Sequence, residues 1–256
     1  MIAIFAAMDT EVHPLLAHGL VHKTSELSGF QVTSVDYDGV DAVVCRTGIG
    51  RSAEAATAAV LGSARFAAAI SFGTAGGLSP SLRAGSILLC DPVCVSADCG
   101  YCDEDGTMAA HARLLEAVRE GLGSAGIPVL SGTSLTVDRG VLTVAEKRRL
   151  RESFGHDIVE MESYWVGKAA AHRAVPFLTV RIVTDEAEDA LPEAALVGAD
   201  GRVDYEALST WARDHSDEVA LLSKLYERWG LGAAGMAQFA EAFLRLEVLG
   251  SLVAAR

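Results

Sequence analysis

The sequence has little positive charge, no long apolar run and no leader segment. Its 256 residues carry 34 acidic side chains against 21 lysines and arginines, which gives a formal net charge of −13. This balance argues against a nucleic-acid partner and against an anionic membrane surface, because both attract basic proteins. No apolar stretch reaches about 18 residues, and the chain begins directly with an apolar strand, Ile2 to Ala6. We therefore expect a cytoplasmic protein with no membrane span.

Metal-binding patterns are also scarce. The seven histidines form no H-E-x-x-H or comparable pair. Cys94, Cys99 and Cys102 have the C-x4-C-x2-C spacing of a plant-type iron–sulfur protein, but the fourth cysteine that should follow them is missing. Five cysteines, an odd number in a chain of ordinary length, are typical of a reducing compartment. We expect neither a metal nor another cofactor.

Two glycine-rich motifs are incomplete. Gly48, Gly50 and Ala53 match the dinucleotide fingerprint G-x-G-x-x-A, but the next expected strand, Phe66 to Phe72, is followed by no acidic residue for a ribose hydroxyl. This motif therefore predicts a tight strand-to-helix turn. The glycine-rich segment 73–77 is not followed by the lysine of a P-loop. It predicts a loop whose backbone amides face a ligand.

What the sequence does have is apolar residues, 50% of the chain, with no Pro-, Gly- or Ser-rich linker between them. One large α/β domain is the expected result. The stretch from Asp157 to Asp185 predicts a strand ending on Glu160 and Glu162, a helix over Ser163 to Ala174, and an apolar strand over Phe177 to Val183. Such units belong to parallel strands covered on both faces.

The remaining elements are predicted from apolar periodicity and turn residues. We expect a short helix at Pro14 to His18 and a hairpin of Phe30 to Val35 and Val40 to Cys45 around Asp38-Gly39. Residues 91–108 predict a loop. The expected helices that follow are Ala109 to Ala125, Val144 to Phe154 and most of Tyr205 to Val248.

Three carboxylates are expected at one edge of the sheet. Glu11 follows the first strand, Glu162 follows a later strand, and Asp185 follows the apolar strand that comes next. Ligands of open α/β sheets bind beyond the carboxyl ends of the strands, so these side chains are candidates for a binding site. Acidic residues also stabilise helix N-termini while facing solvent, and this interpretation stays open for Glu160 and Glu162.

Four motifs, in this order, resemble the purine nucleoside phosphorylase and uridine phosphorylase superfamily: MDTEV at 8–12, SFGTAGG at 71–77, VEMES at 159–163 and VRIVTD at 180–185. The most similar branch is that of the 5'-methylthioadenosine/S-adenosylhomocysteine nucleosidases. The implied fold is a three-layer α/β/α single domain with a central mixed, largely parallel sheet.

The resemblance covers residues 1–190, the expected catalytic core. Residues 191–256 are expected to form a lid loop and C-terminal helices packed on the same domain. Family members usually form dimers or larger rings, so a homodimer or higher homo-oligomer is expected by analogy.

The resemblance also implies a reaction, the hydrolysis of the glycosidic C–N bond of an adenine nucleoside with release of adenine. The implied substrate is 5'-substituted, like methylthioadenosine or S-adenosylhomocysteine. Asp185 is the implied general acid at the purine N7, with a pKa raised by burial. Glu11 is the implied base for water, and Glu162 accepts hydrogen bonds from ribose hydroxyls. The other implied substrate contacts are Thr74, Ala75, Gly76, Glu160, Met161, Arg181 and Thr184.

Phosphorolysis is the alternative reaction. Asp9 and Glu11 in the first loop would repel phosphate, which favours hydrolysis. Arg46 and Arg51, near the turn TGIG, can still supply an anion site and keep phosphorolysis open.

Two further alternatives concern the ligand and the turnover. Residues 185–204 and the helical tail resemble the hopanoid-associated branch, which acts on adenosine with a very large apolar 5' group. That resemblance predicts an open apolar channel bordered by the Leu191 loop and the C-terminal helices. A catalytically silent nucleoside-binding protein is the other alternative, although a binder needs no acid at N7.

Overall fold

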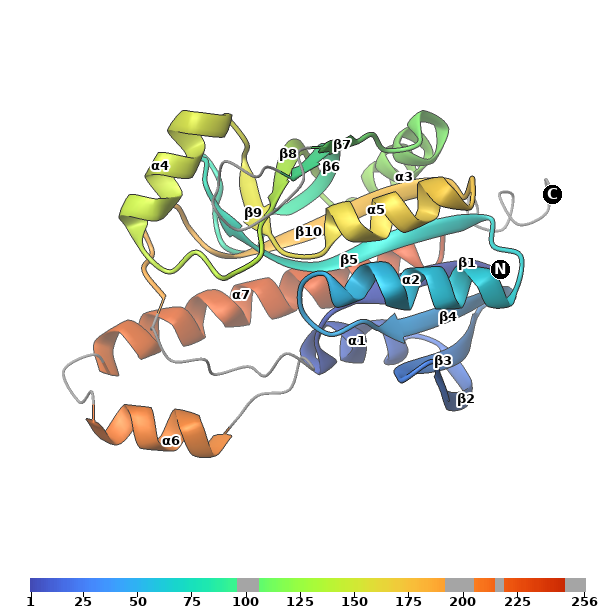
Figure 1. Cartoon of the computed structure of the whole chain (residues 1–256), viewed down its shortest axis with the longest axis horizontal. Helices are drawn as coiled ribbons and strands as arrows, with labels where there is room; N and C mark the ends of the chain where they lie inside the picture. Colours follow the sequence, from blue (N-terminus) through green and yellow to red (C-terminus); the bar gives the residue numbers. More distant parts are fainter. Residues whose placement is uncertain (96–105, 192–204, 215–218, 247–256) are drawn as a thin grey trace.

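The structure is a computed structural model that describes residues 1–95, 106–191, 205–214 and 219–246 (Figure 1). These residues form a mixed β-sheet with helices on both of its faces. The strands are β1 Ile2–Ala6, β2 Leu20–Leu27, β3 Phe30–Tyr37, β4 Val40–Arg46, β5 Ala68–Gly77, β6 Ile87–Val95, β7 Gly106–Met108, β8 Leu130–Thr136, β9 Ile158–Glu160 and β10 Phe177–Asp185.

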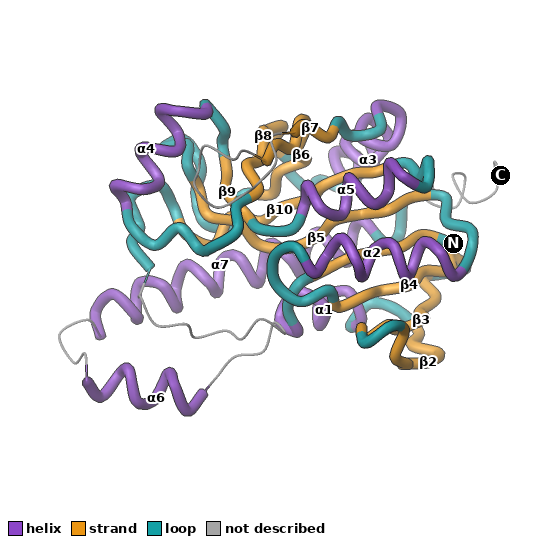
Figure 2. The backbone as a smooth tube through the Cα atoms, viewed as in Figure 1, coloured by secondary structure: helices purple, strands orange, loops and turns teal. Residues whose placement is uncertain are grey.

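Helices connect most of these strands, as Figure 2 shows. Their bounds are α1 Asp9–Leu16, α2 Ser52–Ser63, α3 Ala112–Ser124, α4 Val144–Phe154, α5 Ser163–His172, α6 Tyr205–Asp214 and α7 Val219–Phe243. Within the described ranges no helix is both long and apolar enough to cross a bilayer.

The centre of the sheet is parallel. β1 pairs in parallel with β4 and with β5, and β5 pairs in parallel with β10. The antiparallel strands β3 and β2 extend the sheet beyond β4. The parallel order brings the carboxyl ends of β1, β5 and β10 to the same edge, where the residues after each strand meet.

One half of the sheet closes on itself. β10 also pairs with β6, β6 pairs with β8, β8 pairs with β9, and β9 returns to β5 at Gly76 and Gly77. The five strands β5, β10, β6, β8 and β9 therefore form a ring. The sequence did not predict this ring, because it depends on pairings between segments that are far apart in the chain.

Two apolar cores lie on the two faces of the sheet, and β1 contributes to both. Ala3 and Phe5 belong to one core, while Ile2, Ile4 and Ala6 belong to the other. This alternation explains why the strand is apolar at every position. Helices α2 and α5 cover the first core, and α1, α3 and α7 cover the second. The predicted three-layer α/β/α arrangement is confirmed.

Several predicted boundaries were wrong. The expected loop at residues 73–77 is the end of strand β5, because β10 and β9 supply its hydrogen-bonding partners. The expected loop at 91–108 holds the end of β6 and the short strand β7. Strand β2 was not predicted. Helix α1 begins at Asp9, so that Glu11 lies within its first turn and not in a loop.

Some predictions fall outside the described residues. Cys99 and Cys102 belong to the range 96–105, and the expected lid loop falls largely in 192–204. The division of the chain at residue 190 stays a prediction.

The packing of helix α7 against the sheet is expected to stabilise the fold. Phe239 is fully buried and stacks on Phe72 of β5 and on Phe243, with ring centroids 5.4 and 4.9 Å apart. Phe239→Ala should lower the free energy of unfolding by about 3–5 kcal/mol, because it removes buried apolar area and leaves a cavity. Urea denaturation measures this change. Tyr226→Ala, at a 79% exposed position of the same helix, should change stability by less than about 0.5 kcal/mol. Equal losses in the two variants would contradict the assignment.

Candidate active site

A buried guanidinium lies at the centre of the site. Arg181, in strand β10, has 2% of its surface exposed. Its Nη2 atom lies 2.7 Å from Oε2 of Glu160 and 3.5 Å from Oε2 of Glu162, and it also donates to the hydroxyl of Ser71 at 3.1 Å. A charge this deep requires partners of opposite sign. Arg181 therefore connects the two carboxylates at the end of β9, Glu160 within the strand and Glu162 beyond it, to the middle of the sheet.

Glu160, the last residue of β9, is fully occupied by donors. Its Oε2 accepts from the N–H groups of Glu162 and Ser163 at 2.9 and 2.7 Å and from the Ser163 hydroxyl at 2.8 Å. Its Oε1 accepts from the hydroxyls of Ser134 and Thr136. Burial raises the pKa of Glu160, but the neighbouring guanidinium and these hydrogen bonds outweigh it and lower the pKa overall. These contacts favour a positioning role for this carboxylate.

Glu162 has a different environment. It precedes helix α5, and its Oε1 accepts a 2.9 Å hydrogen bond from the N–H of Gly50. Burial raises its pKa to about 8, with the negative charges of Glu160 and Glu11 acting in the same direction and Arg181 opposing them. The turn around Gly48 and Gly50 therefore holds this carboxyl group.

Glu11 is fixed by four donors. Its Oε2 accepts from the N–H groups of Ala7 and Met8 at 2.9 and 3.1 Å, and its Oε1 accepts from the N–H and hydroxyl of Thr74 at 2.7 and 2.9 Å. Helix α1 places the glutamate, and strand β5 orients it. The sequence analysis named this residue but expected a loop around it, where the structure has helix α1.

Glycine at position 73 makes room for two charged groups. A Cβ atom added there would lie 2.5 Å from Nη1 of Arg181 and 2.7 Å from Oε1 of Glu11. The side chains of Arg181 and Glu11 pass so close to the backbone of β5 that only glycine fits at position 73 without displacing them, although glycine weakens strands in general. Arg181, Glu11 and Glu162 form one charged cluster.

Asp185, at the end of β10, is the second part of the site. Its Oδ1 accepts from the Thr184 hydroxyl at 3.2 Å, and its Oδ2 lies 2.5 Å from Nζ of Lys147. A Cβ on Gly76 would lie 2.9 Å from Oδ2, so this glycine too gives a carboxylate its space. Burial raises the pKa of Asp185 above its ordinary value, and Lys147 opposes that shift.

Lys147 was missed by the sequence analysis. It stands in the charged run KRRLR of helix α4, where a solvated face is the ordinary interpretation. Its spacing of three from the buried Leu150 was the available signal, since residues three apart share one face of a helix.

Strand β5 joins the two parts of the site. Glu11 is bound at Thr74, whereas Asp185 lies beside Gly76 in the register of β5 and β10. Residues two apart in a strand are separated by roughly 7 Å and point to the same face, so β5 brings the two carboxyl groups to the same edge of the sheet. Ala75 is buried between them, and its carbonyl oxygen lies 3.4 Å from the hydroxyl oxygen of Thr184.

Met161 lies at the other side of the cluster. Its Cε atom would be 3.9 Å from a Cβ on Gly50, and the side chain packs against the first core. The contact of Met161 with a sugar stays a prediction.

The arginines that kept phosphorolysis open have acidic partners. Arg46 donates to Oδ1 of Asp9 at 2.7 Å. Arg51 lies 3.7 Å from Glu54 and stacks over the ring of Trp165 at 4.5 Å. Their positive charges are thus opposed by carboxylates or turned toward an aromatic ring.

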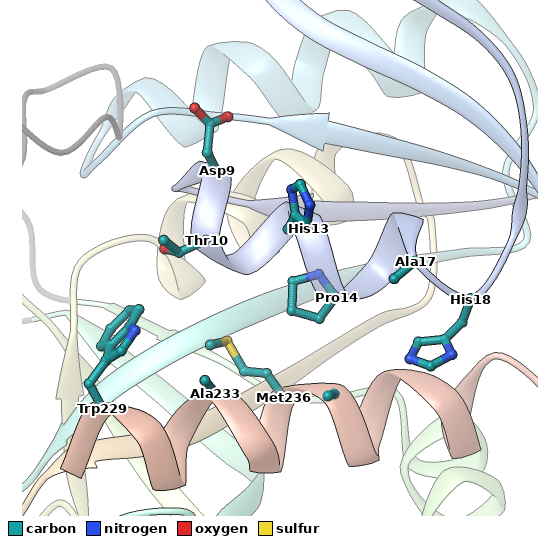
Figure 3. Close-up of a pocket in the computed structure, with 10 residues that line it drawn as sticks. Asp9, Thr10, His13, Pro14, Ala17, His18, Trp229, Ala233 and Met236 are labelled. Atoms are coloured by element: carbon teal, nitrogen blue, oxygen red, sulfur yellow. The ribbon is translucent and has the colours of Figure 1, made fainter. Parts of the chain in front are cut away.

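An apolar groove of about 430 Å³ separates helices α1 and α7 (Figure 3). Trp229, Ala233 and Met236 line it from α7, and Thr10 and Pro14 are among the residues that line it from α1. In Figure 3, Thr10 and Trp229 stand at the same end of the groove. Thr10 directly precedes Glu11 in helix α1.

Fold and site together define an α/β protein with an acidic, arginine-centred site at the carboxyl edge of a mixed sheet. The family model of the phosphorylase superfamily matches residues 1–224. The chain therefore belongs to the phosphorylase superfamily, as its motifs predicted.

Two kinds of relatives are similar to this chain. The 5'-methylthioadenosine/S-adenosylhomocysteine nucleosidase of Shewanella denitrificans is 28% identical over 241 residues, which cover 88% of this chain and 99% of the relative. The nucleosidase of the same name from Neisseria meningitidis, solved with methylthio-immucillin-A, has a TM-score of 0.72 at 21% identity and covers 95% and 98% of the two chains. Futalosine hydrolase of Helicobacter pylori has a TM-score of 0.69 at 18% identity, covering 100% and 97%. The solved structures confirm the fold.

The raised pKa of Glu162 predicts a pH-dependent stability. Between its ordinary value of 4.5 and the folded value of about 8, the folded protein keeps a proton that the unfolded chain has released. Stability therefore falls as the pH rises through this window. In Glu162→Gln the free energy of unfolding should fall less with rising pH than in the wild type, by on the order of a few kcal/mol. Urea denaturation at about pH 5 and about pH 9 measures it.

The matched control is Glu116→Gln, because Glu116 is 56% exposed and pairs with Arg119 on the surface of α3. This variant should follow the wild-type dependence. A Glu162→Gln protein with the wild-type fall in stability would show that Glu162 is already ionised at neutral pH.

Proposed function

We propose that the protein is a purine nucleosidase that hydrolyses the N-glycosidic bond of an adenine nucleoside and releases adenine. The observation that carries this proposal is the placement of Glu11 and Asp185 beside neighbouring residues of β5, with Glu162 between β9 and the Gly50 turn. An acid at one end of a bound nucleoside and a base near the other are what hydrolysis requires. The similarity to the Shewanella nucleosidase supports the same reaction.

Asp185 acts on the leaving base. It gives its proton to N7 of the purine, while the electron pair of the C1'–N9 bond moves into the ring and a neutral base departs. Burial favours the protonated form of Asp185 that this step needs. Thr184 donates to Oδ1 and so fixes the carboxyl group against the purine.

Glu11 acts on the water. Three of its four donors are backbone N–H groups, which cannot turn away, whereas the Thr74 hydroxyl can rotate. Rotation of that hydroxyl frees a lone pair of Oε1 for a water molecule. The carboxylate then takes a proton from the water as its oxygen attacks C1'. Glu162 accepts hydrogen bonds from the ribose, and its ionised form stabilises the positive charge that develops on the sugar.

Hydrolysis is favoured over phosphorolysis by the charges around Glu11. A phosphate would meet the carboxylate of Glu11, while the nearby Arg181 is already held by two glutamates. Arg46 has its contact with Asp9. Uncompensated repulsion between anions in a buried site is large.

The 5' substituent of the substrate is the finer part of the proposal. The groove between α1 and α7 is mostly apolar, and Thr10, one of its lining residues, precedes Glu11 in α1, which suits an apolar group such as methylthio. A larger apolar group, as in the hopanoid-associated branch, would extend further along the same groove. The oligomer, expected to be a homodimer, and the cytoplasmic location belong to this proposal as well.

The first test is the product of the reaction. Purified protein is incubated with methylthioadenosine, S-adenosylhomocysteine, adenosine, inosine and futalosine, each with and without phosphate. We expect free adenine and a free sugar from the 5'-substituted adenine nucleosides, at rates independent of phosphate. A sugar 1-phosphate would establish phosphorolysis instead, and binding without any release of base would establish a silent binder.

A second test removes the acid or the base. Asp185→Asn and Glu11→Gln should each lower kcat by about 10²- to 10⁴-fold, since general acid and base catalysis contribute that much. Asp36→Asn is the control, because Asp36 lies in the β3–β4 hairpin and its amide replacement keeps the bond from Gly39 N–H. It should keep wild-type kcat. An Asp185→Asn variant of wild-type activity would remove Asp185 from the mechanism.

A further inference from the structure

Lys147 is a buried cation directed at Asp185. Its side chain is 1% exposed, and Nζ lies 2.5 Å from Oδ2 of Asp185, 2.7 Å from the carbonyl oxygen of Glu186 and 2.9 Å from that of Asp189. An ammonium group has three hydrogens, and each has one acceptor here. No hydrogen is left for a ligand, so Lys147 can affect a reaction only through Asp185.

The burial of this lysine needs an explanation. Taking an ammonium group out of water is costly, and two of its three acceptors are neutral carbonyls. Asp185 is the carboxylate that its Nζ contacts. An apolar side chain would fill the same volume without that cost, which points to a role at the carboxyl group.

We propose that Lys147 is the positioning residue of the acid: it holds the Asp185 carboxyl group in place and stabilises the carboxylate that remains after the proton has moved to the base. This inference rests on the proposed nucleosidase reaction. In the step concerned, the O–H bond of Asp185 breaks, an N–H bond forms at N7 and the C1'–N9 electron pair enters the purine. Lys147 keeps all of its protons.

The other groups around Asp185 do not duplicate this role. Strands β5 and β9 present Gly76 and Val159, which carry no charge. Asp189, in the turn after β10, is acidic and acts against ionisation of Asp185. Helix α7 offsets Asp189 through Lys224 and Arg228.

The turn that follows Asp185 is clamped from two helices. Lys147 of α4 binds its carbonyl groups, and Arg228 of α7 pairs with Glu186. Oδ2 of Asp189 accepts from the Glu186 N–H at 2.9 Å, which closes the turn. The acid therefore sits on a rigid support, with the ammonium as its charged contact.

The experiment replaces the ammonium and keeps the volume. Lys147→Met should lower kcat by about 10- to 100-fold with KM nearly unchanged, because a charge that acts on the transition state is lost. The alkaline limb of the kcat profile, which reports loss of the Asp185 proton, should move up by about one pH unit or more. Lys147→Arg should keep most of the wild-type kcat and most of the wild-type position of the alkaline limb. Arg148→Met is the control, since Arg148 is 63% exposed on the same helix and should behave as wild type.

A measurement without turnover separates this inference from the proposed function. The ¹³C resonance of the Asp185 carboxyl group, identified by its absence in Asp185→Asn, should titrate at a higher pH in Lys147→Met than in wild type. If this shift occurs in a protein that cleaves no nucleoside, the contact is as inferred and the proposed reaction fails.

The outcomes that overturn the inference are equally distinct. One is an active wild type whose Lys147→Met variant keeps the kcat, the alkaline limb and the titration midpoint. The other is a Lys147→Met protein that fails to fold even at a pH low enough to protonate Asp185, where this carboxyl group needs no counter-ion. Lys147 would then serve the fold and not the acid.

Discussion

The structure depends on one guanidinium inside the sheet. Arg181 occupies a position of β10 where a parallel strand normally carries an apolar side chain, and it faces Glu160 and Glu162 there. Without it, three glutamates would lie close together in a region of low dielectric constant, and the folded state would be strongly destabilised. The same cation sets different properties in the two carboxyl groups. Glu160 has a lowered pKa and is an ionised anchor, whereas Glu162 keeps a pKa of about 8.

Much of the fold and the candidate site follows from local sequence signals. The apolar strands β1 and β10 and helix α4 were predicted because their residues carry a clear period or a continuous apolar run. The edge where Glu11, Glu162 and Asp185 meet follows from the rule for parallel strands, strengthened by four motifs of the phosphorylase superfamily.

The missing parts depend on contacts between distant residues. Gly73 and Gly76 suggested a loop because glycine disfavours strands, but the crossing of Arg181, Glu11 and Asp185 requires small residues within β5. Lys147 was hidden among surface arginines, since nothing in its own segment shows that Asp185 lies against it. The ring of β5, β10, β6, β8 and β9 closes through pairings that no single segment encodes.

The closed ring limits how the molecule can move. Every strand in it has hydrogen-bonded neighbours on both sides, so none can slide or part sideways without breaking a ladder of backbone bonds. A small molecule must enter past the strand ends. We therefore expect the motions that accompany binding in the helix ends near this edge, because helix ends fray far faster than paired strands exchange partners.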